Sequence, residues 1–372
     1  MRIPAGTPVV TGSSDAVNSS IGAGAVAPNQ ATLMIGTSGA LRVVAPQPVL
    51  DPRGRSWCYA IDAAHWLVGG AINNGGVALS WLRDCLNQAH VRQPLTFEDV
   101  LALAGRAPVG SGGLVCLPFF AGERSPNWNL NARAVFFGMS LGHEARHLAR
   151  ALLEGMAFRF KSLLAVLTEV GLDVRQIVAS GGFTQSELWL QVMADALGRE
   201  LSVPEWGETS ALAAAFWPFL SMGGAASISE IRNWVQFSRI QQPVPEHAAA
   251  YDRIYPLYTE LYRSLTGAFD EVARLQAGGH PVEVVETRGH AGELARRLVQ
   301  RVEPVDRGRQ DLADGLEPGA RPGAALGDLE HPALGLVHQL VRRTAAALEH
   351  RGGDLRARLD ELAEDRPLAH DL

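Results

Sequence analysis

Apolar stretches separated by turn-forming residues recur through the first 275 residues and predict strands and helices in turn. ATLMIGTSGALRVV at 31–44 and SWCYAI at 56–61 carry β-branched and aromatic residues around Gly and Ser, which is typical of short strands joined by turns. VALSWLRDCLNQA at 77–89 predicts a helix, and LVCLPFF at 114–120 predicts a buried strand. This part of the chain therefore reads as mixed α/β.

The next part of the pattern predicts one long helix and then a β-α-β-α series. Residues 143–171 place Leu148, Leu152 and Phe158 at roughly helical spacing, and Gly171 suits the position just after a helix. Alternating strands and helices imply an α/β domain. The four segments of the series are QIVAS at 176–180, TQSELWLQVMADALG at 184–198, ELSVPE at 200–205 and ETSALAAAFWPFLSMG at 208–223.

Two local signals refine this pattern. Thr184 and Glu187 have capping-box spacing, so we expect the helix of 184–198 to begin beside the GGF turn at 181–183. Residues 247–275 predict a further helix, whose tyrosine face is most simply a packing surface. Those tyrosines are Tyr251, Tyr255, Tyr258 and Tyr262.

Composition narrows the class of protein. The chain is 47% hydrophobic and 19% charged, and its longest apolar run, 211–222, is short and broken by Pro218, so we expect no membrane span. A net charge of −6 disfavours nucleic acid as a partner. The three cysteines are far apart and MRIPAGTPVV lacks an export pattern, so we predict a reducing, cytoplasmic location.

Two common nucleotide motifs are absent. The single lysine, Lys161, follows Phe160, which excludes a Walker A loop. GAGAVAP at 22–28 keeps only the first two glycines of a dinucleotide-binding turn and runs into proline, so we interpret it as a site of tight helix packing. GTSGA at 36–40 could present backbone N–H groups to an anion, although such a turn on its own is more often a plain hairpin.

HEARH at 143–147 has the spacing of a zinc-binding helix and would indicate a hydrolase through His143, Glu144 and His147. The segment follows SLG and should form the exposed first turn of its helix, and no third ligand follows at short metzincin spacing. We therefore favour a solvated helix start and retain the zinc hydrolase as an alternative.

Several separate stretches together resemble the FGGY carbohydrate kinases, and among them the gluconate kinases most. Residues 134–154 fit the second signature of that family, with Gly138, His147, Leu148 and Glu154 in place. The resemblance covers about 3–275 and implies an actin-like, ribonuclease-H-like ATPase fold, in which two α/β domains close over ATP and sugar. The stretches are TGSSDAVNSSIGAG, GTSGA, LPFFAGERSPNWNLNARAVFFGMSL, HLARALLEG, SGGFTQSELWLQVMADALG and SVPEWGETSALAAAF.

The resemblance also implies roles for particular residues. Asp15, which by sequence alone is a turn or helix-cap acid, matches the catalytic aspartate that takes the proton of the sugar hydroxyl. Asp195, Glu208 and Arg124 recur in the pattern as residues of structural or interface character. The residues expected at ATP include no metal ligand and are Gly36, Thr37 and Gly39 at the phosphates and Gly181, Gly182 and Ser186 at the adenosine.

The family has a large domain before the aspartate that this sequence does not contain, so we expect the C-terminal half of a sugar kinase. The expected function is phosphorylation of a sugar or sugar acid, with D-gluconate favoured, using ATP and Mg²⁺. A half-site predicts little activity alone, so a separate N-terminal half, a homo-oligomer or a non-catalytic ATP-binding fragment remain open. The expected divisions are 1–28, a sugar-domain remnant with Asp15; 29–240, the nucleotide-binding domain; 241–275, a docking helix; and 276–372, a weakly structured polar tail.

Overall fold

A computed structural model describes residue 7, residues 9–88 and residues 93–278, so most of the predicted tail lies outside the described residues. One sheet has the strand order β3-β4-β2-β1-β7-β8-β9, and β5 and β6 form a separate hairpin. The strands are β1 Gln30–Ile35, β2 Gly39–Ala45, β3 Trp57–Ala60, β4 Trp66–Ile72, β5 Val115–Leu117, β6 Val135–Phe137, β7 Gln176–Ser180, β8 Leu201–Pro204 and β9 Phe237–Gln241.

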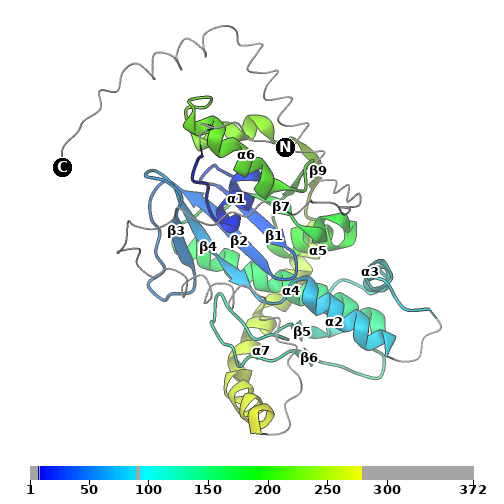
Figure 1. Ribbon diagram of the computed structural model, residues 1–372. Helices are drawn as coiled ribbons and strands as arrows, with labels where there is room; N and C mark the ends of the chain where they lie inside the picture. Colours follow the sequence, from blue (N-terminus) through cyan, green and yellow to red (C-terminus); the bar gives the residue numbers. More distant parts are fainter. Residues whose placement is uncertain (1–6, 8, 89–92, 279–372) are drawn as a thin grey trace, which may run out of the picture. The chain divides into compact units, whose positions relative to one another are not determined.

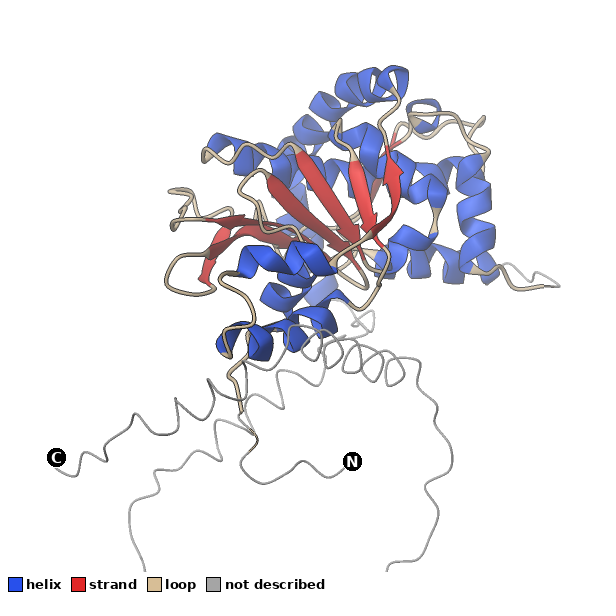
Figure 2. Cartoon of the chain, turned by 90° about the horizontal axis from the view of Figure 1, so that it is seen from above, coloured by secondary structure: helices blue, strands red, loops and turns tan. Residues whose placement is uncertain are grey.

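Helices pack on both faces of this sheet (Figures 1 and 2). The α-helices are α1 Asp15–Gly22, α2 Gly76–Asn87, α3 Phe97–Gly105, α4 Ala145–Glu169, α5 Glu187–Leu197, α6 Thr209–Ser221 and α7 Pro245–Gly278. Short 3₁₀ turns lie at Ser111–Gly113, Gly182–Gln185 and Ile228–Trp234. None of the described helices is both long and apolar enough to cross a membrane.

Strand direction brings three loops to one edge of the sheet. β1, β7 and β8 are parallel, while β1 with β2 and β2 with β4 are antiparallel. β4 therefore runs in the direction of β1, and the loops that follow β1, β4 and β7 leave the same edge. Ligands of open α/β sheets commonly bind at the carboxyl ends of strands.

The two faces of the sheet have separate cores. On one face, Ile21 of α1 and Phe216 of α6 pack with Val44 and Leu67 of the sheet. On the other face, α4 and α5 pack on Leu33 and its neighbours in the larger core. Apolar side chains on both faces explain why the central strands are almost continuously apolar.

α1 and α6 touch at a glycine. A Cβ placed on Gly22, the last residue of α1, would lie 1.7 Å from the carbonyl oxygen of Thr209, the first residue of α6. Only glycine permits this close approach. The GAGAVAP segment therefore packs two helices together, as the sequence predicted.

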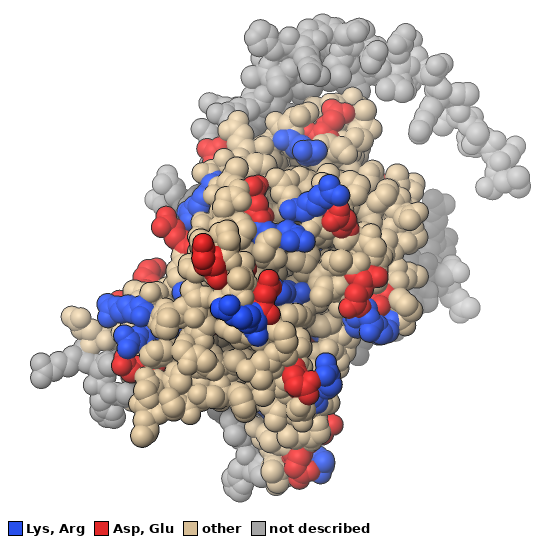
Figure 3. Space-filling model, turned by 180° about the vertical axis from the view of Figure 1, so that it is seen from behind, with Lys and Arg blue, Asp and Glu red and all other residues tan. Residues whose placement is uncertain are grey.

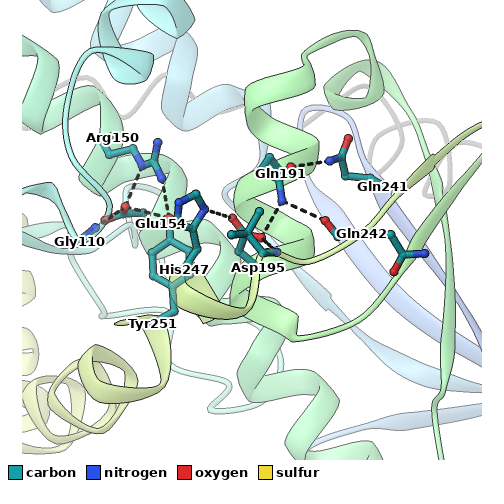
Figure 4. Close-up of polar contacts among 10 residues, drawn as sticks. Gly110, Arg150, Glu154, Gln191, Asp195, Gln241, Gln242, His247 and Tyr251 are labelled. Atoms are coloured by element: carbon teal, nitrogen blue, oxygen red, sulfur yellow. Dashed lines mark hydrogen bonds and ion pairs between the residues drawn. The ribbon is translucent and has the colours of Figure 1, made fainter. Parts of the chain in front are cut away.

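Two buried acids hold α7 against the core (Figure 4). Glu154 of α4 forms an ion pair with Arg150 at 2.8 Å and accepts a hydrogen bond from Tyr251 of α7 at 3.0 Å. Asp195 of α5 accepts hydrogen bonds from the backbone N–H of Val244 and contacts His247 Nδ1 at 2.9 Å. These two acids of the sequence pattern are therefore structural.

The tyrosine face of α7 packs on the long helix α4. Tyr251 and Tyr258 are buried, and the rings of Tyr251, Tyr255 and Tyr258 lie within 6.0 Å of the Phe158 ring. Burial raises the pKa of Tyr258 well above its ordinary value. On the face shown in Figure 3, basic and acidic side chains are interspersed and do not gather by sign.

Two predicted helix starts are displaced. The helix expected at 143 begins at Ala145, with Glu144 as its N-cap. The helix expected from Thr184 begins at Glu187, because Thr184 donates instead to the Gly181 carbonyl and Ser186 is the N-cap. In both cases a polar side chain nearer the helix satisfies the free N–H groups.

Candidate functional site

The β1–β2 turn, residues 36–38, rests on the start of α2. Gly76 N–H donates to the Gly36 carbonyl at 2.7 Å, and the N–H groups of Gly75 and Val77 donate to the Thr37 carbonyl at 3.1 and 3.3 Å. A Cβ on Gly75 would lie 2.7 Å from the Ser38 carbonyl oxygen, so this approach requires glycine. The N-terminus of α2 therefore fixes the turn.

This arrangement orients the N–H groups of the turn. In a trans peptide the N–H points opposite to the carbonyl of the preceding residue. Since the carbonyls of Gly36 and Thr37 point to α2, the N–H groups of Thr37 and Ser38 point away from it. Within the described part of the chain neither N–H has a hydrogen-bond acceptor, and both residues are exposed. Adjacent free N–H groups of this kind can bind an anion.

The turn after β7 lies beside it. Gly181 has φ +93°, and a Cβ there would lie 2.4 Å from the carbonyl oxygen of Ile35, the last residue of β1. Gly182 is exposed, and a Cβ on it would meet nothing within 4 Å. Of the predicted nucleotide residues, the fold thus brings together Gly36, Thr37, Gly181 and Gly182, with open space at Gly182.

Two other predicted residues have packing or capping functions in the fold. Gly39 begins β2, where a Cβ would lie 2.7 Å from the Phe160 ring and 3.1 Å from the Met34 carbonyl oxygen. Ser186 accepts a hydrogen bond from Trp189 N–H at 3.2 Å as the N-cap of α5. The Ser186 hydroxyl proton remains available to a ligand, since a cap uses only the oxygen.

Asp15 is the first residue of α1 and is exposed. Ser14 caps the helix, and Asp15 Oδ1 accepts from Ala16 N–H at 2.7 Å. The positive end of the helix dipole favours a carboxylate at this position. α1 crosses the sheet from β2, where Arg42 donates to Ser19 at 3.0 Å, to β7, so Asp15 lies at the β2 end.

Arg42 lies near this aspartate and Arg124 lies near Arg42, and sequence reasoning did not single out the two arginines together. Desolvation lowers the pKa of Arg42, with Asp15 and Tyr59 opposing and Arg124 adding to the decrease. Desolvation and the charge of Arg159 lower the pKa of Arg124, and Tyr59 opposes them. The two guanidinium groups are thus close enough to repel each other, and the carboxylate of Asp15 acts on Arg42.

Residues of β4 and of the loop after it hold the GERSP loop, which carries Arg124, in place. Asn74 donates to the Gly122 carbonyl at 2.9 Å, and Arg124 Nη2 donates to the carbonyl of Ile72, the last residue of β4, at 2.9 Å. Glu123 is buried in an ion pair with Arg159, and burial raises its pKa to about 7. The loop therefore supports the edge at which the three loops meet.

HEARH does not form a zinc-binding helix. His143 precedes the first residue of α4, and its Nδ1 accepts from Ser140 N–H, while His147 Nδ1 accepts from Glu144 N–H. Among the residues that the structure describes, no group of three or more His, Cys, Asp or Glu is placed to hold a metal ion. These contacts give both histidines a role in ending the loop before α4.

Comparison of the sequence with known proteins identifies its relatives. Residues 31–219 match the C-terminal domain of the FGGY family of carbohydrate kinases. Gluconokinase of Bacillus subtilis (strain 168) is 36% identical over 284 residues, which cover 75% of this chain and 55% of that protein. The chain thus spans about half the length of the curated relatives it matches.

Solved structures of sugar kinases have the same fold. Gluconate kinase from Lactobacillus acidophilus has a TM-score of 0.65 and 33% identity, covering 69% of this chain and 51% of that one. Xylulose kinase from Rhodospirillum rubrum has a TM-score of 0.64 and 32% identity, covering 72% and 54%. The predicted actin-like ATPase fold is confirmed. The chain belongs to the FGGY family of carbohydrate kinases, and it carries the C-terminal domain of that family.

Proposed function

We propose that this chain is the nucleotide-binding half of an ATP-dependent kinase for a primary hydroxyl of a sugar or sugar acid, with D-gluconate to 6-phosphogluconate as the favoured reaction. The observation that carries the proposal is the adjacency of the turns at 36–38 and 181–182, with free N–H groups in the first and open space in the second. The similarity to gluconokinases favours gluconate, while xylulose kinases are also similar.

The proposed chemistry assigns one task to each group. Thr37 and Ser38 N–H bind the phosphates of ATP, and the base lies against Gly181 and Gly182, with Ser186 donating its hydroxyl proton. Asp15 accepts the proton of the substrate hydroxyl as its oxygen bonds to the γ-phosphorus and ADP leaves.

The residues at this edge also fit Mg²⁺ that arrives with ATP. Mg²⁺ is usually bound by substrate phosphates and water together with one or two carboxylates. Thr37 and Ser38 offer N–H donors to phosphate at this edge, and Asp15 at the start of α1 offers a carboxylate. When bound, Mg²⁺ would neutralise phosphate charge, and this chain would orient the nucleotide.

The sugar-binding domain is proposed to come from a separate N-terminal half or from the rest of a longer enzyme, because the matched region covers only 55% of the Bacillus subtilis gluconokinase. Phosphoryl transfer depends on positioning and charge stabilisation from both sides of the cleft. A chain without that second side would bind ATP and turn over slowly, which is the non-catalytic alternative.

Replacing Gly182 with leucine tests the nucleotide site. No neighbour lies within 4 Å of the new Cβ, so the unliganded protein should keep its melting temperature, while the side chain occupies the space proposed for the base. We expect the rise in melting temperature caused by Mg·ATP to disappear. An unchanged rise in the variant would place the nucleotide elsewhere.

Ser186→Ala separates a cap from a ligand contact. Loss of the cap should lower the free energy of unfolding by about 1 kcal/mol, and loss of the hydroxyl should weaken Mg·ATP binding severalfold. Thr96→Ala removes the cap of α3 and is the matched control, expected to reduce stability alone. Equal ATP affinity in the two variants, by calorimetry, would reduce Ser186 to a helix cap.

A further inference from the structure

Arg42 and Arg124 form a cationic pair for which the described residues supply too little negative charge. Asp15 is the acid that acts on Arg42, and no acid is among the groups that shift the pKa of Arg124. The Nε atoms of both side chains are buried without a hydrogen-bond partner in the described part of the chain. Burying charges with so little opposite charge nearby costs free energy. Such groups are typical of sites where a bound ligand supplies the missing charge.

The remaining donors of the pair are free. Arg42 uses Nη1 on Ser19, and Arg124 uses Nη2 on the Ile72 carbonyl. Among the described residues, no acceptor lies within hydrogen-bonding distance of Arg42 Nη2 or Arg124 Nη1, and neither atom is among those buried from solvent. Guanidinium groups bind carboxylates and phosphates through such paired N–H donors.

Register shows where this anion would lie. Arg42 pairs with Thr32, four residues before Gly36, so its Cα lies about 13 Å from the β1–β2 turn. It contacts Ser19, four residues after Asp15, which is a helical rise of about 6 Å. An extended six-carbon acid is long enough to place its carboxylate at Arg42 and its terminal hydroxyl at Asp15.

An aromatic wall lies beside the pair. Trp57 of β3 and Arg42 of β2 both pair with Gly69 of β4, where a Cβ would lie 3.2 Å from Arg42 Cγ. The ring of Trp57 stacks on that of Tyr59 with 4.4 Å between centroids, and Tyr59 is 46% exposed. Tyr59 lies close enough to both arginines to raise their pKa values. Aromatic surfaces with a few charged groups are typical of small-molecule sites.

We propose that Arg42 and Arg124 bind the carboxylate of a sugar-acid substrate, and so select an aldonate over a neutral sugar. This proposal rests on the proposed kinase function and identifies the substrate class of the same site. We assign the pair to the substrate and not to the phosphates because the β1–β2 turn has its own free N–H donors.

The test uses the full chain and two ligands of equal length, gluconate and its neutral analogue glucitol, in which CH₂OH replaces the carboxylate. Binding is followed by calorimetry and by intrinsic tryptophan fluorescence, with and without Mg·ADP. The wild type should bind gluconate at least tenfold more tightly than glucitol. Arg42→Gln and Arg124→Gln should each weaken gluconate binding about tenfold or more and change glucitol binding less than twofold.

Two controls separate the outcomes. Arg175→Gln removes an exposed arginine paired with Asp173 and should leave both sugars unaffected. Affinities for Mg·ADP and Mg·ATP, measured in parallel, test the nucleotide site separately. Absence of nucleotide binding by the wild type would reject the proposed kinase function, whereas the comparison of gluconate with glucitol tests the arginine pair. Equal binding of gluconate and glucitol by the wild type, or no gluconate binding, would overturn it. If the arginine variants lose only the preference for ATP over ADP, the pair binds the γ-phosphate, and this result would also overturn the proposal.

Discussion

With the proposed sugar-binding half supplied, Asp15→Asn is expected to lower gluconate-dependent consumption of ATP by about 10²–10⁴-fold while changing Mg·ATP affinity less than twofold. Asparagine keeps the shape of the side chain and can still accept from Ala16 N–H, but it cannot take the proton of the attacking hydroxyl. The measurement is a coupled assay for ADP with saturating gluconate, paired with calorimetry for ATP.

The fold should tolerate this change. Loss of the carboxylate from the first turn of α1 should cost about 0.3–1 kcal/mol of stability, so the variant remains folded. Asp173→Asn is the matched control because Asp173 is exposed and pairs only with exposed Arg175 in the described chain. Equal turnover by wild type and Asp15→Asn would remove Asp15 from the chemistry.

Gly181→Ala is expected to destabilise the chain by about 3 kcal/mol or more and to abolish Mg·ATP binding. The residue has φ +93° and ψ 176°, a region that is essentially restricted to glycine and costs about 1–3 kcal/mol otherwise. The added Cβ would also lie 2.4 Å from the Ile35 carbonyl oxygen at the end of a central strand. Because the overlap must be relieved, the turn at 181–182 should move away from the β1–β2 turn.

Gly182→Ala provides the comparison for this effect. Its Cβ meets nothing within 4 Å, so the free energy of unfolding should change by less than about 0.5 kcal/mol. Urea denaturation of both variants measures the difference. Similar stability of the two variants would show that the two turns are not packed as described.

Local features of the site could be predicted from the sequence because they depend on nearby residues. GTSGA and QIVASGG each place a turn directly after an apolar strand, and both strands form, as β1 and β7. The joining of those turns depends on parallel pairing between residues 146 apart, such as Gln30 and Gln176, which no local pattern encodes. It was the family resemblance, and not periodicity, that associated them.

Other features could not be predicted for the same physical reason. Arg42 lies between Leu41 and Val43 in a strand, and nothing nearby indicates that Ser19 binds it or that Gly69 leaves space for it. Nothing in the sequence around Gly75 and Gly76 indicates the close approach of α2 to the β1–β2 turn that these glycines permit. Contacts that depend on the absence of a side chain leave no signal in hydrophobic periodicity.

Calorimetric titration of the full chain with Mg·ATP tests the central claim most directly. The adjacent turns predict saturable binding at one site per chain, with Mg·ADP competing for the same site. Absence of binding heat, together with an unchanged melting temperature at millimolar Mg·ATP, would contradict the assignment of this edge as the nucleotide half of a sugar kinase.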